Sequence, residues 1–340
     1  MKDRPSLAVF TEASRKIGTG HLMESLNVVK SARKSGMDVE LWVNRSSPGP
    51  ILDKIPFSYG TFSDVHGVVN VLKAKKFDVA VFNLRRINNS ALRDLPGTGL
   101  KTLCIDELGG RTLDCDAIVN PLIVSKYRRY PASGRKARLY AGADYLAISP
   151  KFAEANDRRR AFKGVIREVS VSMGGADRSG ATLNIIDALS GWRKEVRKNI
   201  ILGAAFPFFS QLKRVEKVLG RLNFKIYRNV KNVVPLFLKS DVVFTAGGNT
   251  LYELACLGVP AVVLYEDEHE RESGLAFQRR GFGACLGKGA NVKKERILAG
   301  LDKFDDPAVR KSHAIKGKEL VDGRGAERIL CIIKGLSKND

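Results

Sequence analysis

The feature that most constrains the fold of this chain is a regular alternation between short β-branched runs and longer amphipathic stretches. After the run at 7–10, apolar residues recur at helical spacing through Leu22, Leu26 and Val29, and Gly36 follows as a helix-ending glycine. Such alternation is typical of βαβ units, which build parallel sheets. The runs that we expect to form strands are LAVF (7–10), DVELWV (38–43), DVAVFN (78–83), KTLCID (101–106), DAIVN (116–120), EVSVSM (168–173), NIILGAAF (199–206), FKIYRNV (224–230), DVVFTA (241–246) and PAVVLY (260–265).

The chain is long enough for two domains, since 44% of its 340 residues are hydrophobic. The stretch at 149–164 is polar, charged and poor in strand formers, so it is interpreted as a linker region. We therefore predict an α/β protein with an N-terminal domain at 1–162 and a C-terminal domain at 163–340. In parallel α/β domains, ligands bind at the carboxyl ends of the strands.

The net charge of +22 calls for an anionic partner or neighbour. The basic clusters at 73–76, 158–160 and 293–296 lie far apart and lack interleaved aromatic residues, so most are expected to be solvated faces. A phosphorylated substrate and peripheral contact with an anionic membrane remain open. Nucleic acid is not expected as a partner.

Cysteine use and the lack of long apolar runs suggest a cytoplasmic protein. The five cysteines form no CxxC pair, so neither a zinc site nor a disulfide framework is expected, and no other metal or cofactor is indicated. No apolar run approaches the roughly 18 residues that a membrane helix needs, and the first residues lack a signal-peptide core. A monomer is expected.

The first of three glycine turns, GTGH, follows the first predicted strand. Gly18 and Gly20 allow a tight turn, and His21 carries the side chain whose ordinary pKa is nearest neutrality. A dinucleotide fingerprint fits poorly, because its third glycine falls on Met23 and the second strand ends on Asn44 where an acid is needed. From the residues alone, His21 is either a catalytic residue or a capping or core histidine.

The second turn, SMGGADRSG (172–180), also joins a strand to a helix. Gly174 and Gly175 expose backbone N–H groups at a helix start, where the helix dipole favours an anion such as phosphate. A plain strand-to-helix turn, with Asp177 as a helix cap, is the alternative.

The third turn, TAGGNTLYELACLGVP (245–260), repeats the arrangement. Thr250 and Glu253 are spaced as a capping box. In the functional interpretation, the N–H groups of Gly248, Asn249 and Thr250 hold a diphosphate and Glu253 binds a ribose diol. From this turn alone, the capping box and the nucleotide-binding interpretation cannot be distinguished.

The stretch GGNTLYELACLGVPAVVL resembles the nucleotide-sugar signature of two-domain glycosyltransferases with the GT-B fold, which has two Rossmann-like domains with facing parallel sheets. Further stretches resemble one branch, the UDP-sugar hydrolase family of pseudaminic acid biosynthesis and the related spore-coat polysaccharide biosynthesis proteins. They occur in family order between about residues 8 and 330: GTGH, CIDE, DAIVNP, YAGADYLAISPKF, VSMGGADRSGATLNIIDAL and VDGRGAERI.

The resemblance implies roles for particular residues. It makes His21 the general base, beside Gly20, and it makes Glu253 the ribose ligand. It places Asn249, Thr250 and Gly248 at the diphosphate. The residues that it places on the nucleotide side or the sugar side of the site are Gly174, Gly175, Asp177, Glu270, Glu24 and Asp106.

The chain departs from the family at three places. Glu24 stands where the family usually has arginine, Ser149 also replaces an arginine, and His269-Glu270 replaces asparagine-glutamine. The expected activity is hydrolysis of a nucleotide sugar, with UDP as the expected nucleotide, by water attack at the anomeric carbon in polysaccharide or nonulosonic acid biosynthesis. The alternatives are a GT-B glycosyltransferase that uses a UDP-sugar donor and a non-catalytic nucleotide-sugar-binding homologue.

Overall fold

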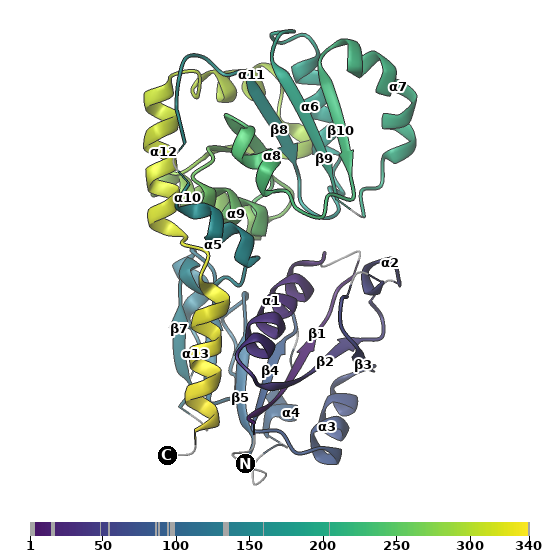
Figure 1. Ribbon diagram of the computed structural model, residues 1–340, viewed down its shortest axis with the longest axis vertical. Helices are drawn as coiled ribbons and strands as arrows, with labels where there is room; N and C mark the ends of the chain where they lie inside the picture. Colours follow the sequence, from purple (N-terminus) through teal and green to yellow (C-terminus); the bar gives the residue numbers. More distant parts are fainter. Residues whose placement is uncertain are drawn as a thin grey trace. The chain divides into compact units, whose positions relative to one another are not determined.

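The computed structural model describes residues 4–14, 18–47, 49–53, 55–85, 87, 89–93, 95, 99–131, 136–158, 160–203 and 205–338. The chain forms two compact units (Figure 1). Unit 1 comprises Met1–Ser149 and Arg324–Asp340, and unit 2 comprises Pro150–Gly323.

The unit boundaries differ from the predicted boundary at 162/163. The polar stretch that we interpreted as a linker begins with helix α5 (Pro150–Asn156), which packs on α9 (Asn249–Leu257) of unit 2. The side-chain amide of Asn156 donates to the carbonyl of Cys256 at 2.7 Å. At the other end, helix α13 (Gly325–Ser337) returns to unit 1.

Unit 1 is built on a parallel sheet. Among its described residues, seven strands lie in the order β3-β2-β1-β4-β5-β6-β7, and every recorded pairing is parallel. The strands are β1 (Ser6–Thr11), β2 (Asp38–Asn44), β3 (Tyr59–Phe62), β4 (Val79–Asn83), β5 (Lys101–Ile105), β6 (Ala117–Asn120) and β7 (Arg138–Ala141).

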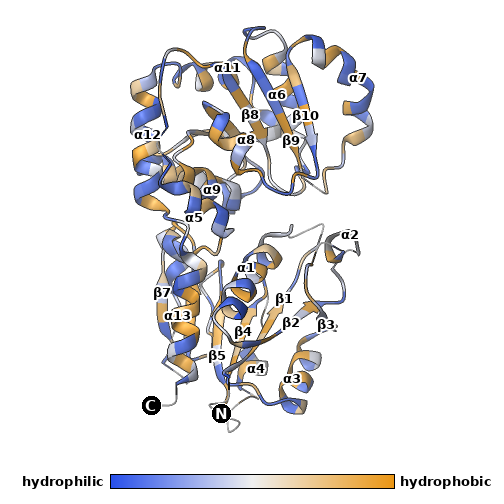
Figure 2. Cartoon of the chain, viewed as in Figure 1, coloured by the Kyte–Doolittle hydropathy of each residue, from blue (hydrophilic) through white to orange (hydrophobic). Residues whose placement is uncertain are grey.

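Helices cover both faces of this sheet, because alternate residues of the buried strands point to opposite sides. Leu7 and Val9 of β1 pack under α1 (Gly20–Lys34) and α13, whereas Ala8 and Phe10 pack on the side of α3 (Val65–Ala74) and α4 (Asn89–Arg93). The short helices of unit 1 are α2 (Gly49–Leu52), η1 (Ser125–Arg128) and η2 (Ala143–Tyr145). In Figure 2 the central strands are largely apolar and the covering helices are mixed.

Unit 2 repeats the design. In the part of unit 2 that the structure describes, six parallel strands lie in the order β10-β9-β8-β11-β12-β13. Its strands are β8 (Glu168–Ser172), β9 (Arg197–Leu202), β10 (Phe224–Arg228), β11 (Val242–Thr245), β12 (Ala261–Tyr265) and β13 (Ala284–Lys288).

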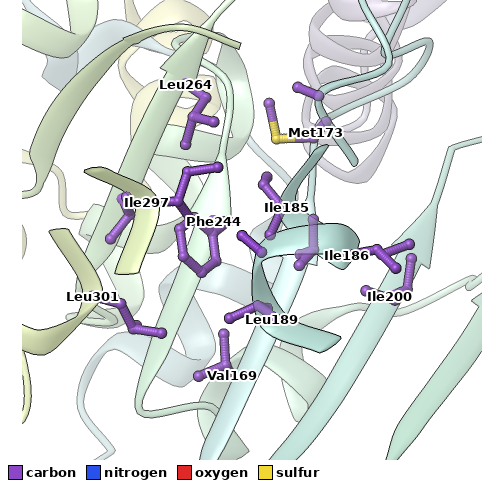
Figure 3. Packing of buried hydrophobic residues seen from close by; sticks show 14 of the residues in the cluster. Val169, Met173, Ile185, Ile186, Leu189, Ile200, Phe244, Leu264, Ile297 and Leu301 are labelled. Carbon is purple, nitrogen blue, oxygen red and sulfur yellow. The ribbon is translucent and has the colours of Figure 1, made fainter. Parts of the chain in front are cut away.

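One core of unit 2 lies between its sheet and a layer of helices. Figure 3 shows Val169 and Phe244 of the sheet against Ile185 and Leu189 of α6 and Ile297 of α11. The helices of unit 2, besides α5 and α9, are α6 (Ala181–Ser190), α7 (Phe209–Arg221), α8 (Val234–Lys239), α10 (Glu268–Arg279), η3 (Gly289–Asn291), α11 (Lys294–Asp302) and α12 (Pro307–Leu320). Of the helices that the structure describes, none is both long and apolar enough to span a membrane.

Each predicted strand is confirmed, although the strand predicted at 199–206 ends at Leu202. The sequence analysis missed β3, β7 and β13. All three lie at sheet edges, where one strand side has no partner and the residues are partly exposed. Such strands lack the continuous apolar run that marks a strand buried on both faces.

The strand order reverses direction at one place in each sheet, between β1 and β4 in unit 1 and between β8 and β11 in unit 2. Ligands of open parallel sheets bind at the carboxyl ends of the strands beside such a switch point. All three glycine turns follow one of these four strands: the first follows β1, the second β8 and the third β11.

Candidate functional site

The switch point of unit 1 brings His21 and Asn83 together. His21 is the second residue of α1, and shortly before this helix Ser14 and Gly18 exchange two backbone hydrogen bonds. Gly18 has a φ of 77°, which favours glycine, whereas Gly20 is the first helical residue. Asn83 is the last residue of β4 and is fully buried.

Asn83 fixes the orientation of the imidazole. Its side-chain N–H group donates to the carbonyl of His21 at 3.1 Å and to Glu24 Oε2 at 3.2 Å, so its Oδ1 atom is the acceptor. That oxygen lies 2.7 Å from His21 Nδ1, which therefore carries the proton and donates it. In the neutral ring, Nε2 is then left with the lone pair, which is the arrangement that a general base needs.

Glu24 lies next to Asn83, from which its carboxyl group accepts a hydrogen bond. It is only 2% exposed, and burial, with the charge of Glu107 as a second cause, raises its pKa well above the ordinary value. The hydrogen bond from Asn83 acts in the opposite direction. Where the resembled family has arginine, this chain thus has a buried acid that contacts the residue that orients His21.

Asp106 follows β5 and lies within a network of its own. Its Oδ2 atom accepts from the backbone N–H of Gly109 at 2.8 Å and from the hydroxyl of Tyr130 at 2.9 Å, and its Oδ1 atom accepts from Arg111. Asp106 is buried, with 2% of the residue exposed. Because protein donors use both oxygens, the geometry gives Asp106 a structural function in the 106–130 region rather than a free acceptor.

The Asn83→Asp variant is expected to lower the free energy of unfolding at pH 8 by a few kcal/mol. The new carboxylate loses both donated hydrogen bonds and lies against Glu24 in a buried site, so its folded pKa is raised. An acid with a raised folded pKa destabilises the fold increasingly as the pH rises above the pKa that the acid has in the unfolded chain, so the loss shrinks as the pH falls toward 5. Urea unfolding at pH 5 and pH 8 measures this, and an equal loss at both values would contradict it.

In unit 2, the turn after β8 does not offer the start of α6 to an anion. Asp177 Oδ1 accepts from the backbone N–H of Ala181 at 2.9 Å, and its Oδ2 atom accepts from that of Thr182 at 2.8 Å. Asp177 therefore caps α6, as the alternative interpretation had it. The Asp177 carboxylate thus occupies these two N–H groups of α6, and a nucleotide-binding role for the N–H groups of Gly174 and Gly175 stays a prediction.

Gly174 and Gly175 form the tight part of the same turn. Gly174 has a φ of 78°, and the carbonyl of Gly175 accepts from the N–H of Ala205 at 3.0 Å. A Cβ atom on Gly203 would lie 2.4 Å from the carbonyl oxygens of both residues. The turn thus packs closely against the end of β9.

The turn after β11 leaves a helix start open. Gly248 precedes the first residue of α9, Asn249, and as the N-cap residue it has no side chain to cap this helix. Thr250 is the second residue of the helix, so the capping box with Glu253 does not form. The N–H groups of Asn249 and Thr250 point out of the helix start, where the dipole favours an anion.

Glu253 lies one turn further along α9. Burial raises its pKa to about 8, and no hydrogen bond to its carboxyl group is recorded within the described residues. A largely desolvated carboxyl group without a donor is costly unless a ligand supplies one. Glu253 is therefore suited to bind hydroxyl groups.

Glu266 and Glu270 lie after β12, at the same edge of unit 2 as the start of α9. Glu266, just after β12, accepts from the backbone N–H of Ser179 at 3.1 Å and pairs with Arg178 at 3.1 Å. Glu270 Oε2 accepts from the backbone N–H of Glu266 at 2.8 Å, and the N–H of Gly247 also donates to this carboxyl group. Burial raises the pKa of Glu270 to about 7.

The structure thus groups the predicted residues within each unit. His21 and Glu24 meet through Asn83 in unit 1, and Gly248, Asn249, Thr250, Glu253 and Glu270 lie on or beside α9 in unit 2. The sequence analysis missed Asn83, Glu266 and Gly247. The signal for Asn83 and Glu266 was a polar residue at or just after the end of a buried strand.

The comparisons with known proteins agree on the architecture. No family model matches the chain. The chain is 26% identical to the spore coat polysaccharide biosynthesis protein SpsG of Bacillus subtilis, over 98% of this chain and 99% of that protein. It is a homologue of SpsG over its whole length.

Two solved structures share the fold. MurG of Acinetobacter baumannii superposes with a TM-score of 0.68 at 14% identity, over 98% of this chain and all of that chain. The chain has a GT-B-like fold. The spinosyn rhamnosyltransferase SpnG, solved in complex with thymidine diphosphate, superposes with a TM-score of 0.63 at 15% identity, over 98% of this chain and 100% of that chain.

Proposed function

We propose that the protein is an enzyme of polysaccharide biosynthesis that uses a nucleoside-diphosphate sugar and transfers the sugar to a hydroxyl group. The observation that carries the proposal is the contact between His21 Nδ1 and Asn83 Oδ1, which leaves Nε2 as the basic nitrogen at the switch point of unit 1. The homology to SpsG and the fold shared with a rhamnosyltransferase support the substrate class.

The proposed proton transfer follows from the orientation of His21 in unit 1. His21 Nε2 takes the proton of the attacking hydroxyl group while its oxygen bonds to the anomeric carbon. The bond from that carbon to the diphosphate oxygen breaks, and the nucleoside diphosphate leaves with the bonding electron pair. Within unit 2, taken by itself, the N–H groups at the start of α9 are suited to bind an anionic diphosphate.

Hydrolysis is the second candidate, with water as the hydroxyl donor. It is favoured by the order of the GTGH, GGAD and GGNTLYE stretches, which resembles that of a UDP-sugar hydrolase family. A panel of UDP- and TDP-sugars, incubated with and without glycerol, ribitol and simple glycosides, separates the two. Nucleotide release that needs an acceptor supports transfer, free sugar without an acceptor supports hydrolysis, and no release from any donor contradicts both.

Glu253 provides a separate test of nucleotide binding. Glu253→Ala is expected to weaken UDP binding by about 10-fold or more, since hydrogen bonds to a charged or polarised group contribute about 1.5 to 3 kcal/mol. Because the lost partner is the ribose diol, the wild-type protein should prefer UDP to 2′-deoxy-UDP and the variant should not. Calorimetric titration of both nucleotides measures this, with exposed Glu268→Ala as the matched control. An unchanged preference in Glu253→Ala would contradict the assignment.

A further inference from the structure

The carboxyl group of Glu270 lies against the turn that leads into α9. It accepts hydrogen bonds from the backbone N–H groups of Glu266 and Gly247. A Cβ atom on Gly248 would lie 3.6 Å from Glu270 Oε1, and one on Gly247 would lie 2.1 Å from the Glu270 carbonyl oxygen. Gly247 therefore lets α10 approach the turn closely, and the approach places the Glu270 carboxyl group beside Gly248 at the open helix start.

The charges that face Glu270 do not offset its own. Glu266 and Asp267 both disfavour its ionised form. Arg178, on the turn after β8, is paired with Glu266, and Arg271 of α10 is paired with Glu268 at 2.7 Å. The turn itself contributes only backbone groups to the contact.

A diphosphate at the start of α9 would therefore meet a carboxylate of the same sign. Like charges within a few ångströms repel strongly where solvent is excluded, and one proton removes the repulsion. The uncapped N–H groups of α9 remain available beside the carboxyl group, so a neutral Glu270 leaves the helix start attractive to an anion.

We propose that the protonation state of Glu270 controls the affinity of this site for a nucleoside diphosphate. The diphosphate binds tightly when Glu270 is neutral and weakly when Glu270 is ionised. The inference rests on the proposed nucleotide-sugar function and adds a pH-dependent control of the same site. Binding above neutral pH then takes up one proton.

Burial raises the pKa of Glu270 to about 7, so its charge changes within the physiological range. Below that pH the side chain is neutral and binding is tight. Above it, the apparent affinity falls by up to about tenfold per pH unit, because the proton must be restored before the diphosphate binds. Glu253 of α9, with a pKa of about 8, titrates in an overlapping range, so the comparison must isolate Glu270.

The test uses UDP-N-acetylglucosamine and TDP-glucose, whose diphosphate esters do not change charge between pH 6 and 8.5. For the wild-type protein, the dissociation constant is expected to rise by about 10- to 30-fold over this range. Glu270→Gln is expected to show a nearly flat profile apart from any Glu253 contribution, and about 10-fold tighter binding than wild type at pH 8.5. Titration in buffers of different ionisation enthalpy is expected to show proton uptake by wild type alone.

Glu268→Gln is the matched control, because it removes the same charge from an exposed side chain two residues away. It is expected to follow the wild-type profile, and thermal unfolding of both variants checks that the fold is kept. Wild-type and Glu270→Gln profiles that run parallel, or weaker binding by Glu270→Gln at pH 8.5, would overturn the inference while leaving the proposed function intact. No binding at any pH by any of the three proteins would overturn the function as well.

Discussion

Replacing His21 with glutamine is expected to lower the turnover of a nucleotide sugar by about 10²- to 10⁴-fold, the usual contribution of a general base. The reason is specific to one atom: Nε2 is the ring nitrogen that the Asn83 contact leaves unprotonated. The affinity for UDP is expected to stay nearly unchanged, since the predicted nucleotide ligands lie on unit 2. Steady-state turnover and calorimetric UDP titration measure the two quantities separately.

The exposed His66 gives the control for this variant, because it is a histidine of the same unit outside the site. His66→Gln is expected to retain wild-type turnover. Equal turnover by His21→Gln and wild type would remove His21 as the base. A parallel loss of UDP affinity would instead give His21 a role in binding.

Arg310→Met is expected to lower the free energy of unfolding by about 3 to 5 kcal/mol, the largest stability effect that we predict. Arg310 is fully buried in α12. Its guanidinium group donates to the carbonyls of Phe304 and Asp305, the latter at 2.9 Å, and to that of Gly164 at 2.6 Å. Methionine fills much of the volume but removes the donor from all three carbonyls, of which that of the buried Phe304 is the least accessible to water. Urea unfolding measures the difference.

Lys311→Met supplies the comparison, because it removes a positive charge from an exposed position of the same helix. It is expected to change the free energy of unfolding by less than about 0.5 kcal/mol. A small effect for Arg310→Met as well would show that these carbonyls find other donors or water. A large effect would show that the three carbonyl contacts of Arg310 together stabilise unit 2.

The sequence predicted the sheets well, because strands buried on both faces carry continuous apolar runs. Leu7–Phe10 needs no tertiary context to be identified as a strand. Edge strands such as β7 depend on that context, since RLYA is as consistent with a loop as with a strand. The sequence could not predict to which unit α13 belongs, because its apolar face could pack against the core of either unit. Its packing with Leu22 and Leu26 of α1 assigns it to unit 1.

For the candidate site, the sequence predicted positions better than roles. His21 and Glu253 were expected at strand-to-helix turns, and the structure places them there. Asp177 was expected beside a diphosphate, but its left-handed backbone with a φ of 43° turns its carboxylate onto the N–H groups of its own helix. Local spacing cannot distinguish a carboxylate that caps a helix from one that awaits a ligand. The role of Asn83 depended on two segments 62 residues apart.

The return of α13 to unit 1 has a consequence for how the chain folds as it is made. Unit 2 is in effect inserted into unit 1, so the ribosome completes the inserted unit before it delivers the helix that closes the host. Ala326, Ile329 and Ile333 of α13 belong to the same core as Leu7 and Val9. Helix α1 covers part of this face early, but the part that α13 covers stays open on the nascent N-terminal sheet until unit 2 and α13 have been translated.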